Sequence, residues 1–216
     1  YCVQKVFSNH YPKAGEYQIP LNTSIMGVID IINKGKVKQY PITIVGGQTT
    51  KQIISFINQR GCKEKFDIGK YHNVEEGELL PETYYYTSCD DIMWIVERMQ
   101  KAQHQYTQDM WHYRDKSIDS ILHNIRNVII LASIVEKESK IQEEKRLIAG
   151  IYINRLRKNM RLQADPTVIY GIMQHDPFFN GKLSYKDLLY NSPYNTYKNR
   201  GLPSTPICNP SKKSID

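Results

Sequence analysis

An eight-residue apolar run, 128–135, broken only by Ser133, is the strongest constraint on how this chain folds. Crossing a bilayer takes roughly 20 apolar residues, so this run predicts a helix buried in a protein core rather than a membrane span. The sequence continues directly into Glu136-Lys137-Glu138-Ser139. The helix, expected over about 127–139, therefore brings two carboxyl groups to the end of a buried stretch.

Glu138 is the more informative of these two carboxyl groups. At helical spacings of three and four it shares a face with Leu131, Ile134, Val135 and Ile141. A carboxyl group on such an apolar stripe loses hydration, which favours its protonated form, and a protonated carboxyl group can act as a general acid on a glycosidic oxygen. The alternative is that Glu138 lies beyond the buried part and faces solvent.

Glu136 is two residues from Glu138 and therefore points in another direction on the helix. We expect it in a surface ion pair, such as one with Lys140.

The remaining pattern predicts an α+β fold. With 216 residues, of which 40% are hydrophobic, the chain has enough material for a core. Apolar periodicity and turn residues predict two strands, at 15–20 and 37–45. The same signals predict five further helices: from Asn22 or Thr23 to 33, from Thr49 or Thr50 to Gly61, over 89–114, from Ser117 through Ile125, and over 143–158. Loops with short helices are expected after residue 159.

Charge and cysteine spacing exclude several classes of protein. The formal net charge is +7, but no block of five or six like charges occurs, so a nucleic-acid-binding domain has little support. The four cysteines are widely spaced without a zinc-type pattern, so no metal site is predicted, and disulfides and free thiols both remain open. Signatures of serine hydrolases, P-loops and dinucleotide sites are absent from the sequence.

Two loop regions offer side chains suited to a sugar. Residues 160–167 are polar and follow a predicted helix, so they can present Gln, Asp and Thr side chains to a ligand. The local alternative is that Asp165 caps a helix with Pro166 in its first position. Residues 192–197 offer hydroxyl groups, an amide and two aromatic faces, although a turn-rich scaffold has the same composition.

Several strings occur in a fixed order: Ala132–Ser139, Ile153–Leu156, Met160–Gly171, Ser192–Tyr197, Gly201–Pro203 and Pro206–Pro210. Together they resemble the endolytic murein (peptidoglycan lytic) transglycosylases of the MltG or YceG-like family. The resemblance covers nearly the whole chain. It implies a small LysM-like βααβ module over residues 1–75, truncated at its N-terminus. A mostly helical catalytic domain with irregular loops follows over 76–216, truncated at its C-terminus.

The resemblance also implies an activity. Members of this family cleave the β-1,4 bond between MurNAc and GlcNAc in nascent peptidoglycan, leave 1,6-anhydro-MurNAc ends and terminate glycan strand elongation. No metal or organic cofactor is expected. Glu138 is the expected catalytic acid and base, because Glu138-Ser139 is similar to the Glu-Ser pair of other lytic transglycosylases. The expected substrate-binding residues are Gln163, Asp165, Thr167, Tyr170, Asn195 and Tyr197.

Partners and location follow from the same resemblance. We expect peptidoglycan glycan strands as substrate, peptidoglycan synthases as further partners, and no nucleic acid. The expected place is the cytoplasmic (inner) membrane, with the catalytic domain on the periplasmic or extracytoplasmic side, held by an N-terminal anchor not present in this chain.

This sequence departs from the family pattern at several points. Gly46-Gly47 replaces a Glu-Gly pair, Ser204 replaces a proline, and the family's continuation after the Asn-Pro motif is missing. The alternative function is therefore a catalytically impaired, non-enzymatic peptidoglycan-binding or scaffold remnant of the same family.

Overall fold

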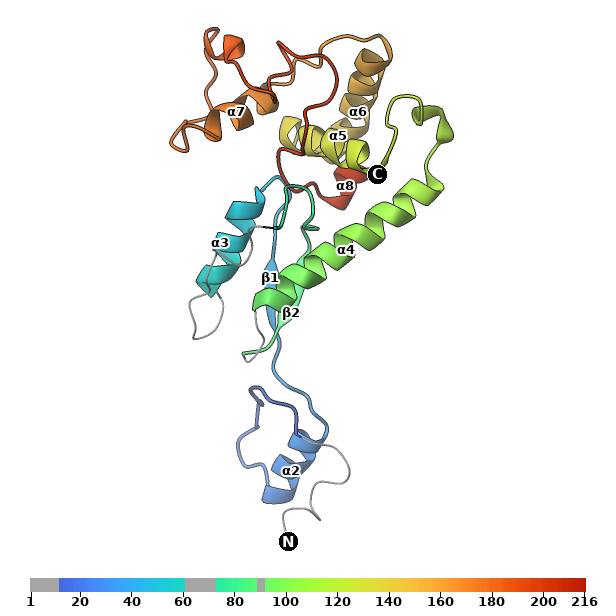
Figure 1. Cartoon of the computed structure of the whole chain (residues 1–216). Coiled ribbons are helices and arrows are strands. Elements are labelled where there is room, and N and C mark those ends of the chain that lie inside the picture. Colours follow the sequence, from blue (N-terminus) through green and yellow to red (C-terminus); the bar gives the residue numbers. More distant parts are fainter. Residues whose placement is uncertain (1–11, 61–72, 89–91) are drawn as a thin grey trace.

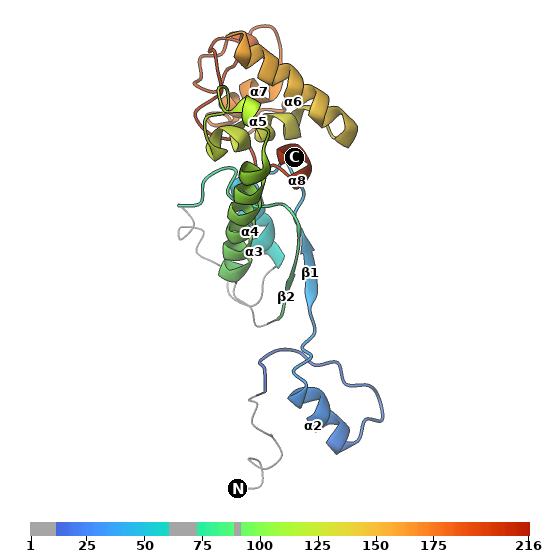
Figure 2. The same cartoon turned by 90° about the vertical axis from the view of Figure 1, so that its right-hand side faces the viewer.

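The computed structural model describes residues 12–60, 73–88 and 92–216, which form three parts arranged one after another (Figure 1). Helix α2 (Ile25–Asn33) stands at one end, a two-stranded sheet with two helices forms the middle, and a cluster of helices forms the other end. A second view at right angles also shows α2 apart from the rest (Figure 2). The predicted mixture of helices and strands, an α+β fold, is confirmed.

Helix α2 begins after Ser24, whose hydroxyl accepts a hydrogen bond from the Gly27 amide at 3.2 Å. Serine is a favoured N-cap, and this start lies one or two residues after the predicted one. The strand predicted at 15–20 is wrong: a single backbone hydrogen bond, from Lys38 N to Glu16 O at 2.7 Å, connects this stretch to the segment before β1. Without that strand, the LysM-like βααβ module is not confirmed.

The middle part is built on strands β1 (Tyr40–Thr43) and β2 (Thr83–Tyr86), which pair antiparallel with Ile42 opposite Tyr84. Helices α3 (Thr50–Arg60) and α4 (Ile92–Tyr113) lie against one face of this sheet (Figure 2). The core between them contains Ile42, Ile53, Ile57, Tyr84, Val96 and Met99. The predicted strand 37–45 is thus shorter than expected, and the predicted helix end at Gly61 lies outside the described residues.

The helical part contains the apolar run. Helix α5 (Ile125–Glu138) starts at the cap Asn124, whose side chain accepts from the Asn127 amide at 2.9 Å. Of the predicted run 128–135 it buries residues 130–135, while Val128 and Ile129 are half-buried. Helices α6 (Gln142–Arg157) and α7 (Asp165–Met173) follow, with the 3-10 helix η3 (Asp187–Leu189) and the short α8 (Lys212–Ile215) among loops. Each described helix is too short or too polar to cross a membrane.

The helix predicted from Ser117 through Ile125 is wrong. Only the 3-10 helix η2 (Lys116–Ile118) forms there, capped by Asp115, and the chain then turns before Asn124 starts α5. Asn124 is a strong N-cap, so a new helix begins where the predicted one would have continued.

Residues 206–211 return from the helical part and lie between α5 and the middle part. Asn209 is fully buried, and its Oδ1 accepts from the amides of Gly77 and Leu79 at 3.1 and 2.9 Å. Its Nδ2 donates to Thr50 Oγ1 at 3.0 Å. One asparagine side chain thereby joins segments about 130 and 160 residues away in the sequence.

Cys208, next to Asn209, is buried as a free thiol whose pKa is raised by burial. Cys2, Cys62 and Cys89 lie outside the described residues.

Candidate active site

Glu138 is the last residue of α5, and its side chain is exposed. The apolar stripe remains buried as far as Val135, but the chain then leaves the core, and Ile141 is 53% exposed. The prediction of a desolvated Glu138 is therefore wrong for the free protein, and the alternative that it lies beyond the buried part is confirmed. Its carboxyl group still has a fixed partner, because Tyr152 on α6 donates from Oη to Glu138 Oε1 at 2.6 Å.

Glu136 is the buried carboxylate of the pair. Its Oε1 lies 3.0 Å from Lys145 Nζ, and the two side chains are only 10% and 6% exposed. The Ser211 amide and hydroxyl donate to Oε2 at 2.9 and 2.6 Å, and the Ser214 hydroxyl donates at 2.6 Å. Burial alone would raise the pKa of Glu136, but these hydrogen bonds outweigh burial and lower it. The predicted surface ion pair with Lys140 is wrong, because Glu136 faces inward and binds the C-terminal segment.

Asp165 begins α7, but it does not cap this helix as the local alternative predicted. The N-cap is Ala164, which makes no side-chain cap hydrogen bond. The Asp165 carboxyl group instead accepts a hydrogen bond from Tyr197 Oη at 2.5 Å. This hydrogen bond is the main reason that the pKa of Tyr197 rises to about 12, with a further contribution from burial.

The Glu138–Tyr152 and Asp165–Tyr197 pairs are close enough to act on each other. The pKa of Tyr152 is raised first by burial and then by its hydrogen bond to Glu138, and the Asp165 charge adds to this effect. The Glu138 charge likewise raises the pKa of Tyr197. The Arg155 charge, by contrast, lowers the pKa of both tyrosines. We call these five side chains, linked by two hydrogen bonds and by these charge effects, the Glu138 cluster.

Tyr152 and Arg155 were not assigned a role from the sequence. They are three residues apart on α6 and therefore share a face, which is the signal that could have found them. Arg155 also donates from Nη1 to the Leu162 carbonyl oxygen and so connects α6 to the loop before α7.

Two predicted substrate-binding residues, Thr167 and Asn195, are fully buried. Thr167 Oγ1 donates to Ala164 O at 2.6 Å and lies 2.9 Å from Thr196 Oγ1. Asn195 Nδ2 donates to two backbone carbonyl oxygens at 2.7 and 3.0 Å, and its Oδ1 accepts from the Tyr197 amide at 2.9 Å. Both residues therefore hold the loops of the site in place, behind the surface that a ligand would touch.

Tyr170 is half-buried and packs edge-on against Tyr194, with ring centroids 4.8 Å apart. Burial raises its pKa, and the next contribution comes from Glu76, which is not part of the Glu138 cluster. Gly171 explains how closely this helix meets the 192–197 loop, because a Cβ on it would lie 2.5 Å from Ser192 Oγ. Tyr170 and Tyr194 pack against the apolar cluster that contains Tyr152 and Val135, whereas Asp165 and Tyr197 are the predicted residues whose charge or hydrogen bond acts on the Glu138–Tyr152 pair.

Gln163 and Tyr197 line a groove of about 520 Å³ together with other residues of the α7 region: Arg161, Tyr185, Leu188, Leu189 and Lys198. Gln163 is exposed and has a positive φ of 51°, a conformation that is uncommon for residues other than glycine. Because Tyr197 belongs both to the groove and to the Glu138 cluster, the groove adjoins the cluster.

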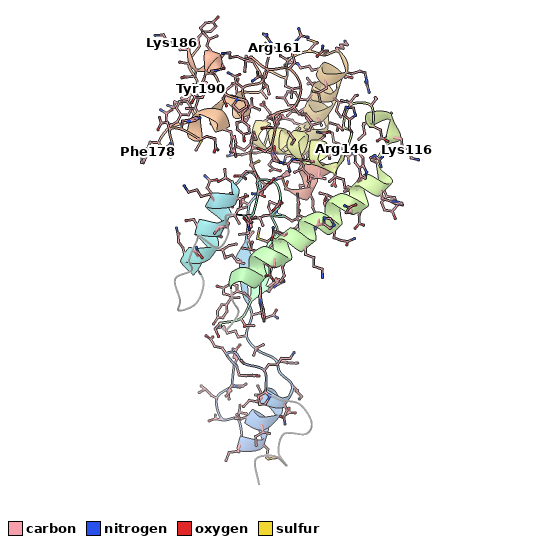
Figure 3. The ribbon with its side chains drawn as sticks, in the orientation of Figure 1. Lys116, Arg146, Arg161, Phe178, Lys186 and Tyr190 are labelled. Atoms are coloured by element: carbon pink, nitrogen blue, oxygen red, sulfur yellow. The ribbon has the colours of Figure 1, made fainter. Side chains whose placement is uncertain are left out.

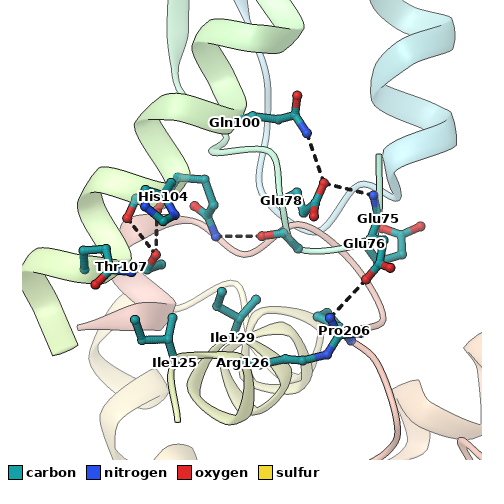
Figure 4. Close-up of a pocket in the computed structure, with 13 residues that line it drawn as sticks. Glu75, Glu76, Glu78, Gln100, His104, Thr107, Ile125, Arg126, Ile129 and Pro206 are labelled. Atoms are coloured by element: carbon teal, nitrogen blue, oxygen red, sulfur yellow. Dashed lines mark hydrogen bonds and ion pairs between the residues drawn. The ribbon is translucent and has the colours of Figure 1, made fainter. Parts of the chain in front are cut away.

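A separate pocket of about 400 Å³ lies between α4, α5 and the 75–78 loop (Figure 4). Its polar side chains are largely paired with one another: Arg126 Nη1 lies 3.1 Å from Glu75 Oε2, and Gln100 donates to Glu78 at 3.0 Å. None of the predicted site residues lines it. In the described part of the chain, no three His, Cys, Asp or Glu side chains gather where they could hold a metal ion.

Comparisons with known proteins give the same family as the sequence pattern. An endolytic murein transglycosylase of Bacillus subtilis (strain 168) is 37% identical over 138 residues, which are 62% of this chain and 35% of that protein. One from Streptococcus pneumoniae serotype 2 (strain D39) is 31% identical over 150 residues, 65% of this chain and 25% of that protein. The chain thus spans about a third or less of the length of these relatives.

Among solved structures, a putative yceG-like protein of Listeria monocytogenes matches with a TM-score of 0.60 and 29% identity, over 87% of this chain and 68% of that one. The sequence profile of the YceG-like family matches residues 2–216. The chain therefore belongs to the YceG-like family.

Proposed function

We propose that this chain carries the activity for which its relatives are named, that of an endolytic murein transglycosylase. In this proposal it cleaves the β-1,4 bond between MurNAc and GlcNAc within peptidoglycan strands and leaves 1,6-anhydro-MurNAc ends. The observation that carries the proposal is the pairing of an exposed Glu138 with Tyr152, next to Asp165, Tyr197 and a groove.

One carboxyl group suffices for this reaction. Glu138 gives its proton to the glycosidic oxygen as the bond to C1 breaks. The resulting carboxylate then takes the proton of the sugar's own C6 hydroxyl, whose oxygen bonds to C1. The nucleophile belongs to the substrate, so water is not consumed and the second step has the advantage of an intramolecular reaction. A second carboxylate acting as nucleophile, which most glycosidases require, is not needed.

The neighbours of Glu138 are suited to these two steps. The Tyr152 hydroxyl donates to the carboxylate, so it holds this group in place and stabilises its charged form after the first step. Asp165, held by Tyr197, offers negative charge to the developing oxocarbenium ion.

Substrate must supply what the free protein lacks, namely exclusion of water from Glu138. A bound glycan strand would cover the exposed carboxyl group, and removal of water favours the uncharged acid that the first step needs.

The substrate also determines where this activity would occur. Peptidoglycan strands lie outside the cytoplasmic membrane, so we place the catalytic part on the extracytoplasmic side, near peptidoglycan synthases and held by an anchor.

The test is digestion of purified glycan strands, with mass spectrometry for anhydro-MurNAc ends and the Bacillus subtilis relative as positive control. We expect product from the parent chain and from Glu143→Gln, an exposed control on α6, and none from folded Glu138→Gln. Product from Glu138→Gln together with its loss in a folded Glu136→Gln would contradict the assignment. If the positive control forms product and the parent chain does not, the non-enzymatic glycan-binding alternative is favoured.

A further inference from the structure

The groove beside the Glu138 cluster is cationic. Its lining includes the guanidinium of Arg161 and the ammonium of Lys198, and no carboxylate lines it among the described residues. Lys198 Nζ has only neutral neighbours in hydrogen-bond range, Asn191 Oδ1 at 3.3 Å and Leu189 O at 3.5 Å. Within the described ranges, neither cation forms an ion pair, so both charges remain available to an anion.

The backbone that carries Arg161 is fixed on both sides. Asn159 has a positive φ of 51°, and its carbonyl oxygen accepts from Arg200 Nη1 at 2.5 Å. Gln163 has the same φ, and its amide donates to Thr196 O at 3.2 Å. Asn159 follows the C-cap of α6, where a left-handed residue commonly ends a helix and Asn tolerates that conformation. Arg161 therefore lies on a short segment that the Asn159 and Gln163 contacts hold at both ends.

Tyr197 connects the groove to the Glu138 cluster, because it lines the groove and its hydroxyl binds Asp165. The 3-10 helix η3 contributes Leu188 and Leu189 to the same lining. Figure 3 shows Arg161 at the end of the molecule where Lys186 and Tyr190 also lie. A ligand at Glu138 can therefore extend a substituent over the two cations.

We propose that this groove binds the anionic lactyl-peptide substituent of the muramyl sugar, with the carboxylates of the stem peptide paired to Arg161 and Lys198. The inference rests on the proposed function and adds a specificity determinant to it. Glucosamine polymers without this substituent carry no carboxylate, so the two cations would make the site select muramyl-containing strands. The planar guanidinium of arginine can donate two parallel hydrogen bonds to one carboxylate, whereas the lysine ammonium acts only as a point charge.

Binding is best measured without turnover, in the Glu138→Gln variant of the full chain. Three ligands of equal length separate the sources of charge: strands with intact stem peptides, strands stripped of peptide but keeping the lactyl carboxylate, and neutral chitooligosaccharide. For intact strands we expect Arg161→Gln to raise Kd about tenfold, and Lys198→Gln to raise it less, since an arginine–carboxylate pair holds two hydrogen bonds. For neutral chitooligosaccharide neither substitution should change Kd.

Matched controls remove a positive charge elsewhere. Arg146→Gln and Lys116→Gln alter exposed cations that Figure 3 shows well away from Lys186 and Tyr190. Equal weakening by these variants, or an equal loss with neutral chitooligosaccharide, would overturn the proposal. Peptide-stripped strands that keep the whole Arg161 effect would place the lactyl carboxylate, rather than the stem peptide, in the groove, and would overturn the stem-peptide assignment.

Two further outcomes concern other anions and the activity itself. An Arg161 effect of the same size on phosphatidylglycerol vesicles or duplex DNA would mean a general anion surface and would also overturn the proposal. If the parent chain forms anhydro-MurNAc but Arg161→Gln does not change Kd, this inference is wrong and the proposed function stands. Carboxylate-dependent binding without product formation supports the groove and defeats the proposed function.

Discussion

The Glu136–Lys145 pair allows a structural role to be separated from a catalytic one on the same helix. In Glu136→Gln the amide oxygen can still accept from Ser211 and Ser214, but the Lys145 ammonium loses its carboxylate while remaining 6% exposed. Breaking a buried pair costs about 3–5 kcal/mol, and the hydrogen bond from Lys145 to Ser214 at 2.9 Å favours the lower end. At roughly 2–4 °C per kcal/mol for a chain of this size, Tm should fall by about 6–12 °C.

A double substitution separates two causes of the lost stability: the missing attraction between Glu136 and Lys145, and the cost of a buried Lys145 charge without a partner. Glu136→Gln combined with Lys145→Met removes the charge that the single variant leaves buried, so the double variant should be more stable than the sum of the single effects, by about 2 kcal/mol. Lys140→Met, an exposed change on the same stretch, is the control and should alter Tm by less than about 2 °C.

The stability that Glu136 contributes should change with pH in one direction. Because the folded protein lowers the pKa of Glu136 below its ordinary 4.5, its contribution to stability is complete above that value and is lost as pH falls through the lower folded value. The difference in Tm between the parent chain and Glu136→Gln should therefore be largest above about pH 5.5 and shrink in more acidic buffer.

Thermal unfolding followed by circular dichroism, at several pH values, measures all of these effects. A Glu136→Gln variant with the parent Tm, or a difference that grows on acidification, would refute the reasoning. Glu138→Gln should leave Tm within about 2 °C of the parent, since its side chain is exposed.

The other predictions concern the site and the packing around it. Tyr152→Phe removes the donor to Glu138, so kcat on glycan strands should fall about tenfold with little change in KM; an unchanged kcat would contradict its positioning role. Tyr197→Phe frees Asp165 and should also lower kcat, and loss of binding alone would instead place Tyr197 only in the groove. Gly171→Ala should lower the free energy of unfolding by about 1–3 kcal/mol, because its Cβ would meet Ser192 Oγ at 2.5 Å, and denaturant titration measures it. Asn209→Ala, which leaves two buried amides without acceptors, should cost about 2–4 kcal/mol by the same titration.

The elements that the sequence predicts well are those with strong periodicity. The apolar run that becomes α5 and the pattern of α4 both have enough turns for a face to be recognised. The strand at 15–20 fails because a strand needs a partner, and alternation within one segment does not reveal whether a partner exists. The helix from Ser117 fails because Asn124 starts a new helix, and capping overrides the apolar spacing.

The candidate site shows a similar division. The sequence places Glu138, Asp165 and Tyr197 on separate segments. In the structure Tyr152 binds Glu138, Tyr197 binds Asp165, and the Asp165 charge acts on Tyr152. Helical spacing put Glu138 on an apolar face correctly, but it could not show that the core ends one turn earlier, at Val135. It also could not show that Glu136 faces Lys145, because that contact depends on how α5 and α6 cross.

The position of Asn209 has a consequence for how the protein folds during synthesis. The amides of Gly77 and Leu79 have no acceptor from this side chain until a residue 130 or more positions later has left the ribosome. Contacts of such long sequence separation slow folding, because a long loop must close before they form. The 73–80 loop is therefore translated early, but its contacts with Asn209 form only after the C-terminal segment has been made. A chain arrested before residue 206 should remain open to protease in this loop.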